Sequence, residues 1–292
     1  MKQSVFISPF VDRGFKILFG QENSKELLID LLNDLLEGER HIEDLTYMNT
    51  EMPPETSDGR TAVFDLRCKD KDGNMFIVEM QNCNQPYIYE RGLYYICRAI
   101  AGQDKIGDGW NFDIVPVYGI FFLNFKSGKT NKVRSDIILA DKETGEPVSK
   151  MIREIFIEFP LFNKTEEECE TPLDYWLYNL KHMEKLESLQ FKGQKALFQR
   201  LEELARIVKM NKKERDEYEA CLKVYRDNYN TWNYMKEQAI AEGIAEGRAE
   251  GFEEGMEKAQ YNMAKKMKAD NVPYEIIVKY TGLSVEEIEN IN

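Results

Sequence analysis

Long apolar runs, histidines and paired cysteines are scarce in this sequence of 292 residues. It has no run of about 18 apolar residues, so no transmembrane helix is expected. Its N-terminal segment does not consist of basic residues followed by an apolar stretch, so no secretory signal is expected either. Five cysteines without a C-x-x-C pair and only two histidines argue against a structural zinc site. We therefore expect a cytoplasmic protein with reduced thiols.

A surplus of positive charge is also missing, because 52 acidic residues outweigh 39 basic ones and leave a net charge of −13. A protein that coats nucleic acid usually presents a basic surface to the phosphates. The deficit excludes a general coat of this kind but not a local basic patch. Residues 125–134 (FKSGKTNKVR) contain Lys126, Lys129 and Lys132 and no acid. They predict a basic hairpin tip that contacts nucleic acid or, alternatively, one that only aids solubility.

A strand–turn–strand pattern is present from residue 61 to residue 82 (TAVFDLRCKDKDGNMFIVEMQN). Residues 62–69 and 75–80 are rich in apolar or β-branched side chains, and Asp72-Gly73 between them is a strong hairpin signal. The sequence therefore predicts a β-hairpin here.

Acidic and amide side chains are placed to meet on one face of this hairpin. Because side chains alternate along a strand, Glu79 and Gln81 should share one face while Val78 and Met80 enter the core. Asp65 on the first strand is expected to join the polar group. Two carboxylates suit Mg²⁺, which can make a bound water nucleophilic and offset the charge of a phosphate. The alternative is an ordinary solvated sheet face.

With these residues, the stretch resembles the core of the PD-(D/E)XK nuclease superfamily and, more narrowly, the bacterial family of recombination-promoting nucleases (Rpn) and putative transposases. The resemblance implies that Asp65 and Glu79 hold Mg²⁺ or Mn²⁺. Gln81 stands where the superfamily usually has lysine, and it can orient a water but carries no charge. The Glu-x-Gln version is common in this family, which favours a variant site over a lost one.

The N-terminal segment PFVDRGFKILFG, residues 9–20, resembles the opening signature of the same family. In the superfamily the first helix often lends an acid or a base to the site. The resemblance therefore makes Asp12 and Lys16 candidate catalytic residues, although the aromatic positions of this segment also fit an ordinary helix that faces the core.

A helix predicted over residues 87–103 places two arginines and two tyrosines on one face. Arg91, Tyr95 and Arg98 are candidate nucleic-acid contacts, because arginine binds phosphate and tyrosine stacks on bases. Core packing of the tyrosines is the alternative.

The order of segments predicts an α/β fold, in which a mixed sheet of about five or six strands is flanked by helices. The resemblance makes this a restriction-endonuclease-like sheet over residues 1–161. An all-α region should follow, divided into a helical region at 162–235 and an association tail at 236–292.

The predicted tail contains Glu-Gly pairs that recur every four residues from Glu242 to Gly255. Each glycine inside a helix costs about 1 kcal/mol relative to alanine, and close approach of a second helix would offset that cost. We therefore expect a homo-oligomer, with a partly disordered linker as the alternative. A helix, a glycine turn and a short helix that offers Glu286, Glu287 and Glu289 end the chain. This hairpin favours protein contact over DNA reading.

The resemblance implies a Mg²⁺-dependent endodeoxyribonuclease that hydrolyses phosphodiester bonds in transposition or recombination. The alternative is a catalytically inactive nuclease fold that acts as an oligomerising interaction module. RNA as the substrate stays open.

Overall fold

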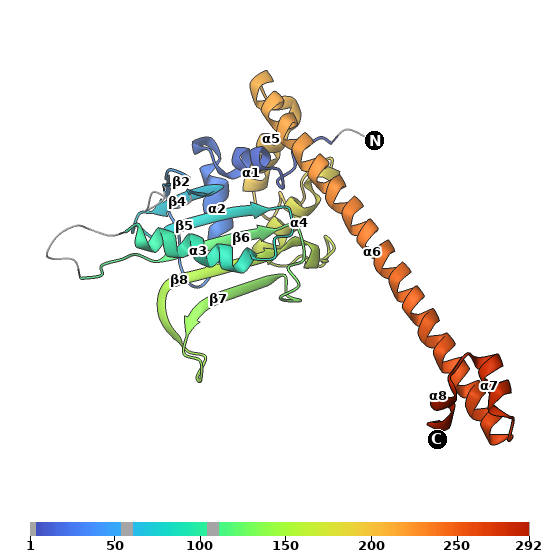
Figure 1. Cartoon of the computed structure of the whole chain (residues 1–292). Coiled ribbons are helices and arrows are strands. Elements are labelled where there is room, and N and C mark those ends of the chain that lie inside the picture. The colour runs from blue at the N-terminus through green and yellow to red at the C-terminus, as the bar shows by residue number, and fades with distance from the viewer. Residues whose placement is uncertain (1–3, 54–60, 104–110, 292) are drawn as a thin grey trace. The chain divides into compact units, whose positions relative to one another are not determined.

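Strands and helices alternate in the first part of the chain and helices alone follow, in a computed structural model that describes residues 4–53, 61–103 and 111–291. The strands are β1 (Leu45–Tyr47), β2 (Glu51–Met52), β3 (Ala62–Val63), β4 (Leu66–Asp70), β5 (Met75–Gln81), β6 (Val117–Leu123), β7 (Arg134–Ala140) and β8 (Pro147–Glu158). The helices are α1 (Asp12–Phe19), α2 (Lys25–Leu35), α3 (Ile88–Ala101), α4 (Pro172–His182), α5 (Leu197–Ala205), α6 (Lys212–Ala269), α7 (Tyr274–Thr281) and α8 (Val285–Glu289). The predicted α/β class with an all-α C-terminal region is confirmed (Figure 1).

Six strands form one mixed sheet in the order β1-β4-β5-β6-β8-β7, and β2 pairs only with β3. Strands β5, β6 and β8 run parallel, whereas β1, β4 and β7 run antiparallel to their neighbours. The carboxyl ends of the three parallel strands therefore meet at one end of the sheet, which is where ligands bind in many α/β folds. Because β1 and β7 are the edge strands, the hairpin that carries the candidate acids lies in the interior of the sheet.

The hairpin predicted at residues 61–82 forms between β4 and β5, with Leu66 opposite Val78. Its first strand is shorter than predicted, because the chain bends at Asp65 and splits the run into β3 and β4. In the turn, Gly73 adopts a φ of 89°, and the main-chain N–H of Asn74 donates to the Asp70 side chain at 2.9 Å. The turn chemistry thus sets the register that brings Asp65 level with Glu79.

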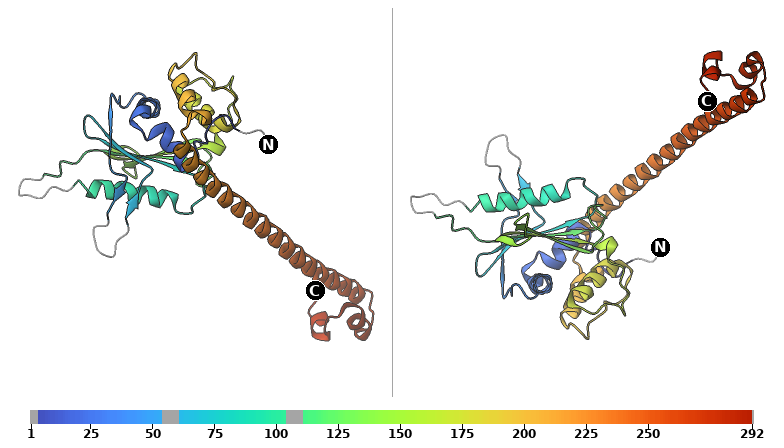
Figure 2. Two further views of the ribbon diagram at one scale, coloured as in Figure 1. Left: turned by 90° about the horizontal axis from the view of Figure 1, so that it is seen from above. Right: turned by 90° about the horizontal axis from the view of Figure 1, so that it is seen from below.

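Both faces of the sheet are covered by helices. Helices α1, α2, α4 and α5 pack on the face that contains Val78 and Met80, and α3 packs on the face that contains Ile77. Figure 2 shows α3 (teal) and the α1–α2 pair (blue) on opposite sides of the sheet. Val78 and Met80 enter the core as predicted, but Glu79 is also buried, because α3 covers the face that a simple hairpin would leave in water.

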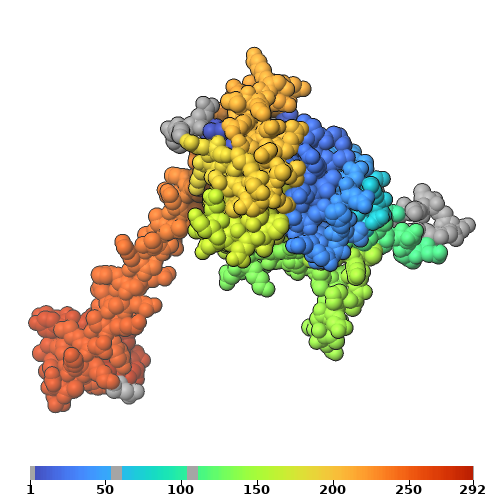
Figure 3. Space-filling view, turned by 180° about the vertical axis from the view of Figure 1, so that it is seen from behind, coloured from blue at the N-terminus to red at the C-terminus, as the bar shows by residue number. Residues whose placement is uncertain are grey.

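The basic segment 125–134 does not form a hairpin tip, and this prediction was wrong. Strand β8 lies between β6 and β7, so the segment is a loop that crosses from one strand to a strand two places away. Residues 147–151 of β8 run past the end of the β6 pairing and, with β7, form an arm that projects from the sheet (Figure 3).

The chain divides into two compact units, residues 1–225 and residues 226–292. The predicted divisions at 161/162 and 235/236 stay predictions. In the first unit, Trp176 of α4 and Phe198 of α5 belong to the same core as the sheet. Helix α6 continues without a break from Lys212 to Ala269, through the Glu-Gly repeat.

The second unit ends in the predicted helical hairpin. Gly282 adopts a φ of 76° between α7 and α8, and Ser284 caps α8 by accepting a hydrogen bond from the main-chain N–H of Glu287. Ile277 and Ile288 pack with Ala264 of α6 in a small separate core. Among the described residues, no helix combines the length and apolarity that a membrane span requires. The cytoplasmic location stays a prediction.

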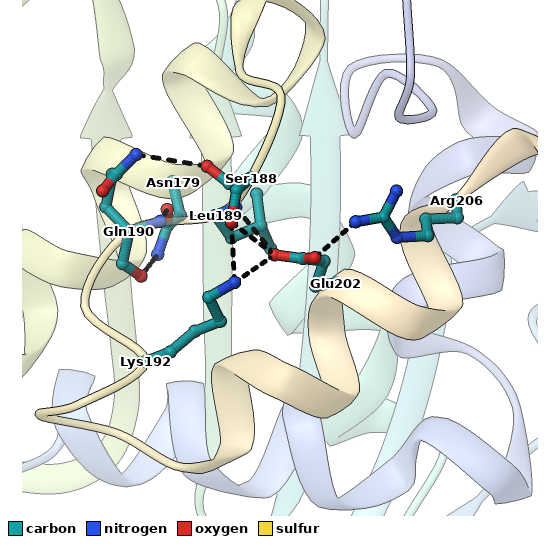
Figure 4. A network of polar contacts seen from close by, with 7 residues as sticks. All are labelled: Asn179, Ser188, Leu189, Gln190, Lys192, Glu202 and Arg206. Atoms are coloured by element: carbon teal, nitrogen blue, oxygen red, sulfur yellow. Dashed lines mark hydrogen bonds and ion pairs between the residues drawn. The ribbon is translucent and has the colours of Figure 1, made fainter.

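A partly buried carboxylate, that of Glu202, fixes the connection between α4 and α5 (Figure 4). Glu202 accepts hydrogen bonds from the main-chain N–H of Leu189 at 2.9 Å, from Lys192 at 2.7 Å and from Arg206 at 2.6 Å. Burial by itself raises the pKa of Glu202, but the hydrogen bonds from Lys192 and Arg206 outweigh it and lower the pKa to about 2. The charged form therefore stabilises the fold.

We expect Glu202→Gln to lower the free energy of unfolding by about 2 kcal/mol near neutral pH. Because the folded-state pKa lies below the ordinary value of 4.5, the contribution is present above that value and is lost as the pH falls toward 2. Urea unfolding of wild type and variant should therefore converge in acid. Glu203→Gln, at a neighbouring exposed position, is the control, and an equal loss in both variants would contradict this account.

Candidate active site

Asp65 and Glu79 face each other across β4 and β5 and are locked together through the main chain. The main-chain N–H of Asp65 donates to Glu79 Oε1 at 3.0 Å, and the main-chain N–H of Met80 donates to Asp65 Oδ2 at 2.7 Å. Asp65 is half-buried, and Glu79 is only 1% exposed. The hairpin register thus holds two carboxylates side by side at the end of β5 where the chain leaves the sheet.

Gln81 completes this polar group from the last position of β5. Its Nε2 donates to Glu79 Oε2 at 2.8 Å, so both carboxylate oxygens of Glu79 accept hydrogen bonds. Alternation along β5 places both side chains on one face, as the sequence predicted. An amide can turn to present its oxygen or its N–H₂, which suits it to orient a water but not to carry a proton.

The pKa of both carboxyl groups is raised in this arrangement. Burial raises the pKa of Glu79 to about 8, and the charge of Asp65 adds to the rise. Burial also raises the pKa of Asp65, and the hydrogen bond from Met80 opposes the rise. Two buried carboxylates that repel one another are a site at which added positive charge is strongly favoured.

Helix α3 brings Arg91 and Tyr95 over the same carboxylates. Arg91 Nε donates to the Tyr95 hydroxyl at 2.8 Å, Arg91 Nη1 donates to Gln85 Oε1 at 2.8 Å, and the guanidinium lies 5.0 Å from the centre of the Tyr95 ring. The positive charge of Arg91 lowers the pKa of both Asp65 and Glu79, against the larger effect of burial. Arg91 is thus oriented by its neighbours and lies within electrostatic reach of both acids.

The close approach of α3 depends on Gly92. A Cβ at this position would lie 2.8 Å from Glu154 Oε1 and 3.0 Å from the Phe121 ring. A larger residue here would require the Glu154 side chain and the Phe121 ring, or the helix, to shift.

Asp12 and Lys16 of α1 form an ion pair of 2.8 Å. Their charges act on the Asp65 carboxyl in opposite directions, since Asp12 raises and Lys16 lowers its pKa. The structure therefore brings the first helix into electrostatic range of Asp65.

The candidate nucleic-acid residues divide between two places. Lys126, Lys129 and Lys132 are exposed on the loop that follows β6, whose first residue, Asn124, donates its main-chain N–H to Gln81 O at 2.9 Å. This loop therefore begins directly beside the acids. Arg98 lies two turns along α3 from Arg91 and donates to the carbonyl of Pro53.

Two buried carboxyl groups on β8 had not been singled out from the sequence. Glu154 is 4% exposed and burial raises its pKa to about 7, and Glu158 is 0% exposed. The signal was present, because two glutamates four residues apart in an apolar strand must share one face.

The donor set at Asp65 and Glu79 suits a divalent cation that keeps several of its water ligands when bound. The described residues contain no cluster of three or more Asp, Glu, His or Cys side chains arranged to hold a metal. Mg²⁺ is commonly held by one or two carboxylates with several waters. The two acids, with carbonyl and amide oxygens beside them, meet that requirement.

Comparison with known proteins gives one match. A family described as PD-(D/E)XK nuclease family transposase matches residues 9–235, which include Asp65, Glu79 and the helices on both faces of the sheet. No curated protein and no solved structure matches the chain.

Without metal, we expect the protein to lose stability as the pH rises from about 5 to about 9, and Glu79→Gln to reduce that loss by about 2 kcal/mol. The folded-state pKa of Glu79 is raised, so its contribution is full below the ordinary value of 4.5 and is lost as the pH rises through about 8. Urea unfolding in EDTA measures the effect. Glu90→Gln, at an exposed position of α3, is the control. Parallel pH profiles for wild type and Glu79→Gln would contradict the assignment.

Proposed function

The chain belongs to the PD-(D/E)XK nuclease family of transposases, and from this premise we propose that it is a metal-dependent endonuclease that hydrolyses phosphodiester bonds of DNA. The observation that carries the proposal is the juxtaposition of Asp65 and Glu79, of which one is half-buried and the other buried, and which are linked through main-chain hydrogen bonds. Family membership supports a nuclease-related or transposase-related function, and the choice of DNA and of Mg²⁺ or Mn²⁺ is our inference.

In this proposal Asp65 and Glu79 hold the cation, because each can turn an oxygen away from its present hydrogen bond without leaving the hairpin. When bound, a divalent cation makes a water nucleophilic and offsets phosphate charge. Gln81 releases Glu79 and orients the attacking water. Asp12 or Lys16 assists from α1, with Lys16 able to pass a proton or to steady a phosphate oxygen.

The substrate's phosphates are held by cations around the carboxyl end of β5. Arg91 faces the acids from α3, and the loop after β6 places exposed lysines on the adjacent side. The chain as a whole, with a net charge of −13, repels DNA. These cations therefore attract DNA only near the site.

We expect Asp65→Ala and Glu79→Gln each to reduce cleavage of supercoiled plasmid by about a thousandfold or more, since each removes one of two metal-holding carboxylates. Conversion to nicked or linear DNA is followed with Mg²⁺, with Mn²⁺ and with EDTA. Asp72→Asn changes an exposed acid of the same hairpin and should leave cleavage unchanged. Cleavage that persists in Asp65→Ala would contradict the assignment of the active site to these residues.

We also propose that α6 pairs with the α6 of a second copy of the chain. Ile240, Ile244, Phe252 and Met256 recur at multiples of four residues and are 48–69% exposed. The glycine row 243–255 runs beside them, and nothing lies within 4 Å of where its Cβ atoms would be. The row of large apolar side chains forms a ridge, and the glycine row beside it forms a groove. The ridge of one α6 helix can therefore pack into the groove of an identical helix. This surface also supports the alternative function, an inactive nuclease fold that assembles.

Gly247→Leu should dissociate the pair while strengthening the isolated helix, because leucine fills the groove yet has the higher helix propensity. Sedimentation velocity measures the mass and circular dichroism the helix content. Ala245→Leu adds the same bulk on the opposite side of α6 from the glycine row. This control variant should still sediment with the mass of a dimer. A monomeric wild type at all concentrations would contradict self-association.

A further inference from the structure

The loop between β6 and β7, residues 124–133, is strongly basic yet rests on a buried acid. Lys126, Lys129 and Lys132 are exposed, and none of them forms an ion pair with a described residue. Arg134 at the end of the loop differs, because its guanidinium is paired with Asp136 at 2.7 Å. The three lysines therefore carry charge that is free to meet an anion.

The acid is Glu158, the last residue of β8, which is 0% exposed. Ser127 supplies a hydrogen bond to each of its carboxylate oxygens: the main-chain N–H donates to Oε2 at 2.9 Å and the hydroxyl donates to Oε1 at 2.5 Å. Hydrogen bonds to an ionised carboxylate are short and about twice as strong as neutral ones. Glu158 thus binds the middle of the loop to the carboxyl end of β8.

Both ends of the loop are fixed as well. The main-chain N–H of Asn124 donates to Gln81 O at 2.9 Å, and that of Glu158 donates to Val133 O at 2.8 Å. Inside the loop, the main-chain N–H of Lys129 donates to Ser127 Oγ at 3.1 Å, so one serine ties the acid to the segment that carries the lysines.

Burying a carboxylate without a cation beside it costs stability, and proteins keep such groups mainly where they serve a site. The position of Glu158 supplies a reason, because β5, β6 and β8 are parallel and their carboxyl ends meet. Glu158 lies level with Leu123, which in turn lies level with Gln81. An anchor at Glu158 therefore sets the distance between the lysines and the candidate acids.

We propose that Ser127 and Glu158 are a positioning pair that holds the lysines of the 124–133 loop against the substrate's phosphate backbone, in register with Asp65 and Glu79. The inference rests on the proposed nuclease function. Neither residue touches the reacting atoms. Their role is to order the loop before the substrate binds, so that contacts with the phosphates form without a further loss of conformational entropy.

The test compares Ser127→Ala with Ser127→Thr, which keeps the hydroxyl, and with Thr130→Ala as a matched control. Thr130 lies in the same loop, but its hydroxyl accepts only from the main-chain N–H of Lys132, at 3.0 Å, among the described residues. Binding of a short labelled DNA duplex to the full chain is measured in EDTA over a range of salt concentrations. The kcat and KM of cleavage are measured with Mn²⁺.

We expect Ser127→Ala to raise Kd and KM about tenfold with little change in kcat, because it weakens binding of substrate and transition state alike. The slope of log Kd against log salt should fall by about one to two, as ordered lysine–phosphate contacts are lost. Ser127→Thr should restore both values, and Thr130→Ala should resemble wild type. A loss of stability alone would leave the salt slope of the folded protein unchanged.

Wild-type cleavage combined with an unchanged KM and salt slope in Ser127→Ala would overturn the positioning pair and leave the nuclease proposal standing. Failure of Ser127→Thr to restore the slope would do the same. A folded wild type that neither binds nor cleaves the duplex would overturn both proposals together.

Discussion

The arrangement of the first unit depends on two carboxylates that are linked through the main chain, one buried and one half-buried. Asp65 and Glu79 lie level across β4 and β5, and each accepts a hydrogen bond from the main chain on the other's strand. The β4–β5 ladder fixes Glu79 directly and begins at Leu66, next to Asp65, so its register sets how the two acids meet. When both groups are charged, their mutual repulsion lowers the stability of the folded state, yet the fold holds them side by side. Such a conflict between stability and local arrangement is typical of functional sites.

The fold concentrates the remaining polar groups around this pair. Parallel β5, β6 and β8 end together, so the segments that follow them leave from one end of the sheet. Helix α3 closes one face, and Gly92 allows it to approach closely enough for Arg91 to act on the acids. The lysines of the 124–133 loop follow β6 at the carboxyl end of the parallel strands. A protein with a net charge of −13 thus has several cations near its two raised-pKa carboxyl groups.

Local patterns in the sequence predicted the parts of the site that depend on local rules. The Asp72-Gly73 turn set the β4–β5 register, and alternation correctly sent Val78 into the core. The helical hairpin at the C-terminus followed from its glycine turn in the same way. In each case the physical cause lies within a few neighbouring residues.

Long-range pairing explains what the sequence did not reveal. No local signal shows that β8 inserts between β6 and β7, and the local pattern of the basic segment predicts a hairpin tip that the structure does not contain. Burial of Glu79 depends on α3 covering the second face, which alternation alone does not predict. Glu158 is a different case, because a charge inside an apolar strand is visible in the sequence. Only the three-dimensional contact with Ser127 gives it a role.

The central claim is that Asp65 and Glu79 form a divalent-metal site. Isothermal titration calorimetry of Mn²⁺ into the full chain, with Asp65→Asn and Glu79→Gln as comparisons, tests it without requiring catalysis. We predict one saturable site in the wild type that is lost or greatly weakened in both variants, because each removes one of the two anionic ligands. Absence of binding to the folded wild type, or equal binding by all three proteins, would contradict the account.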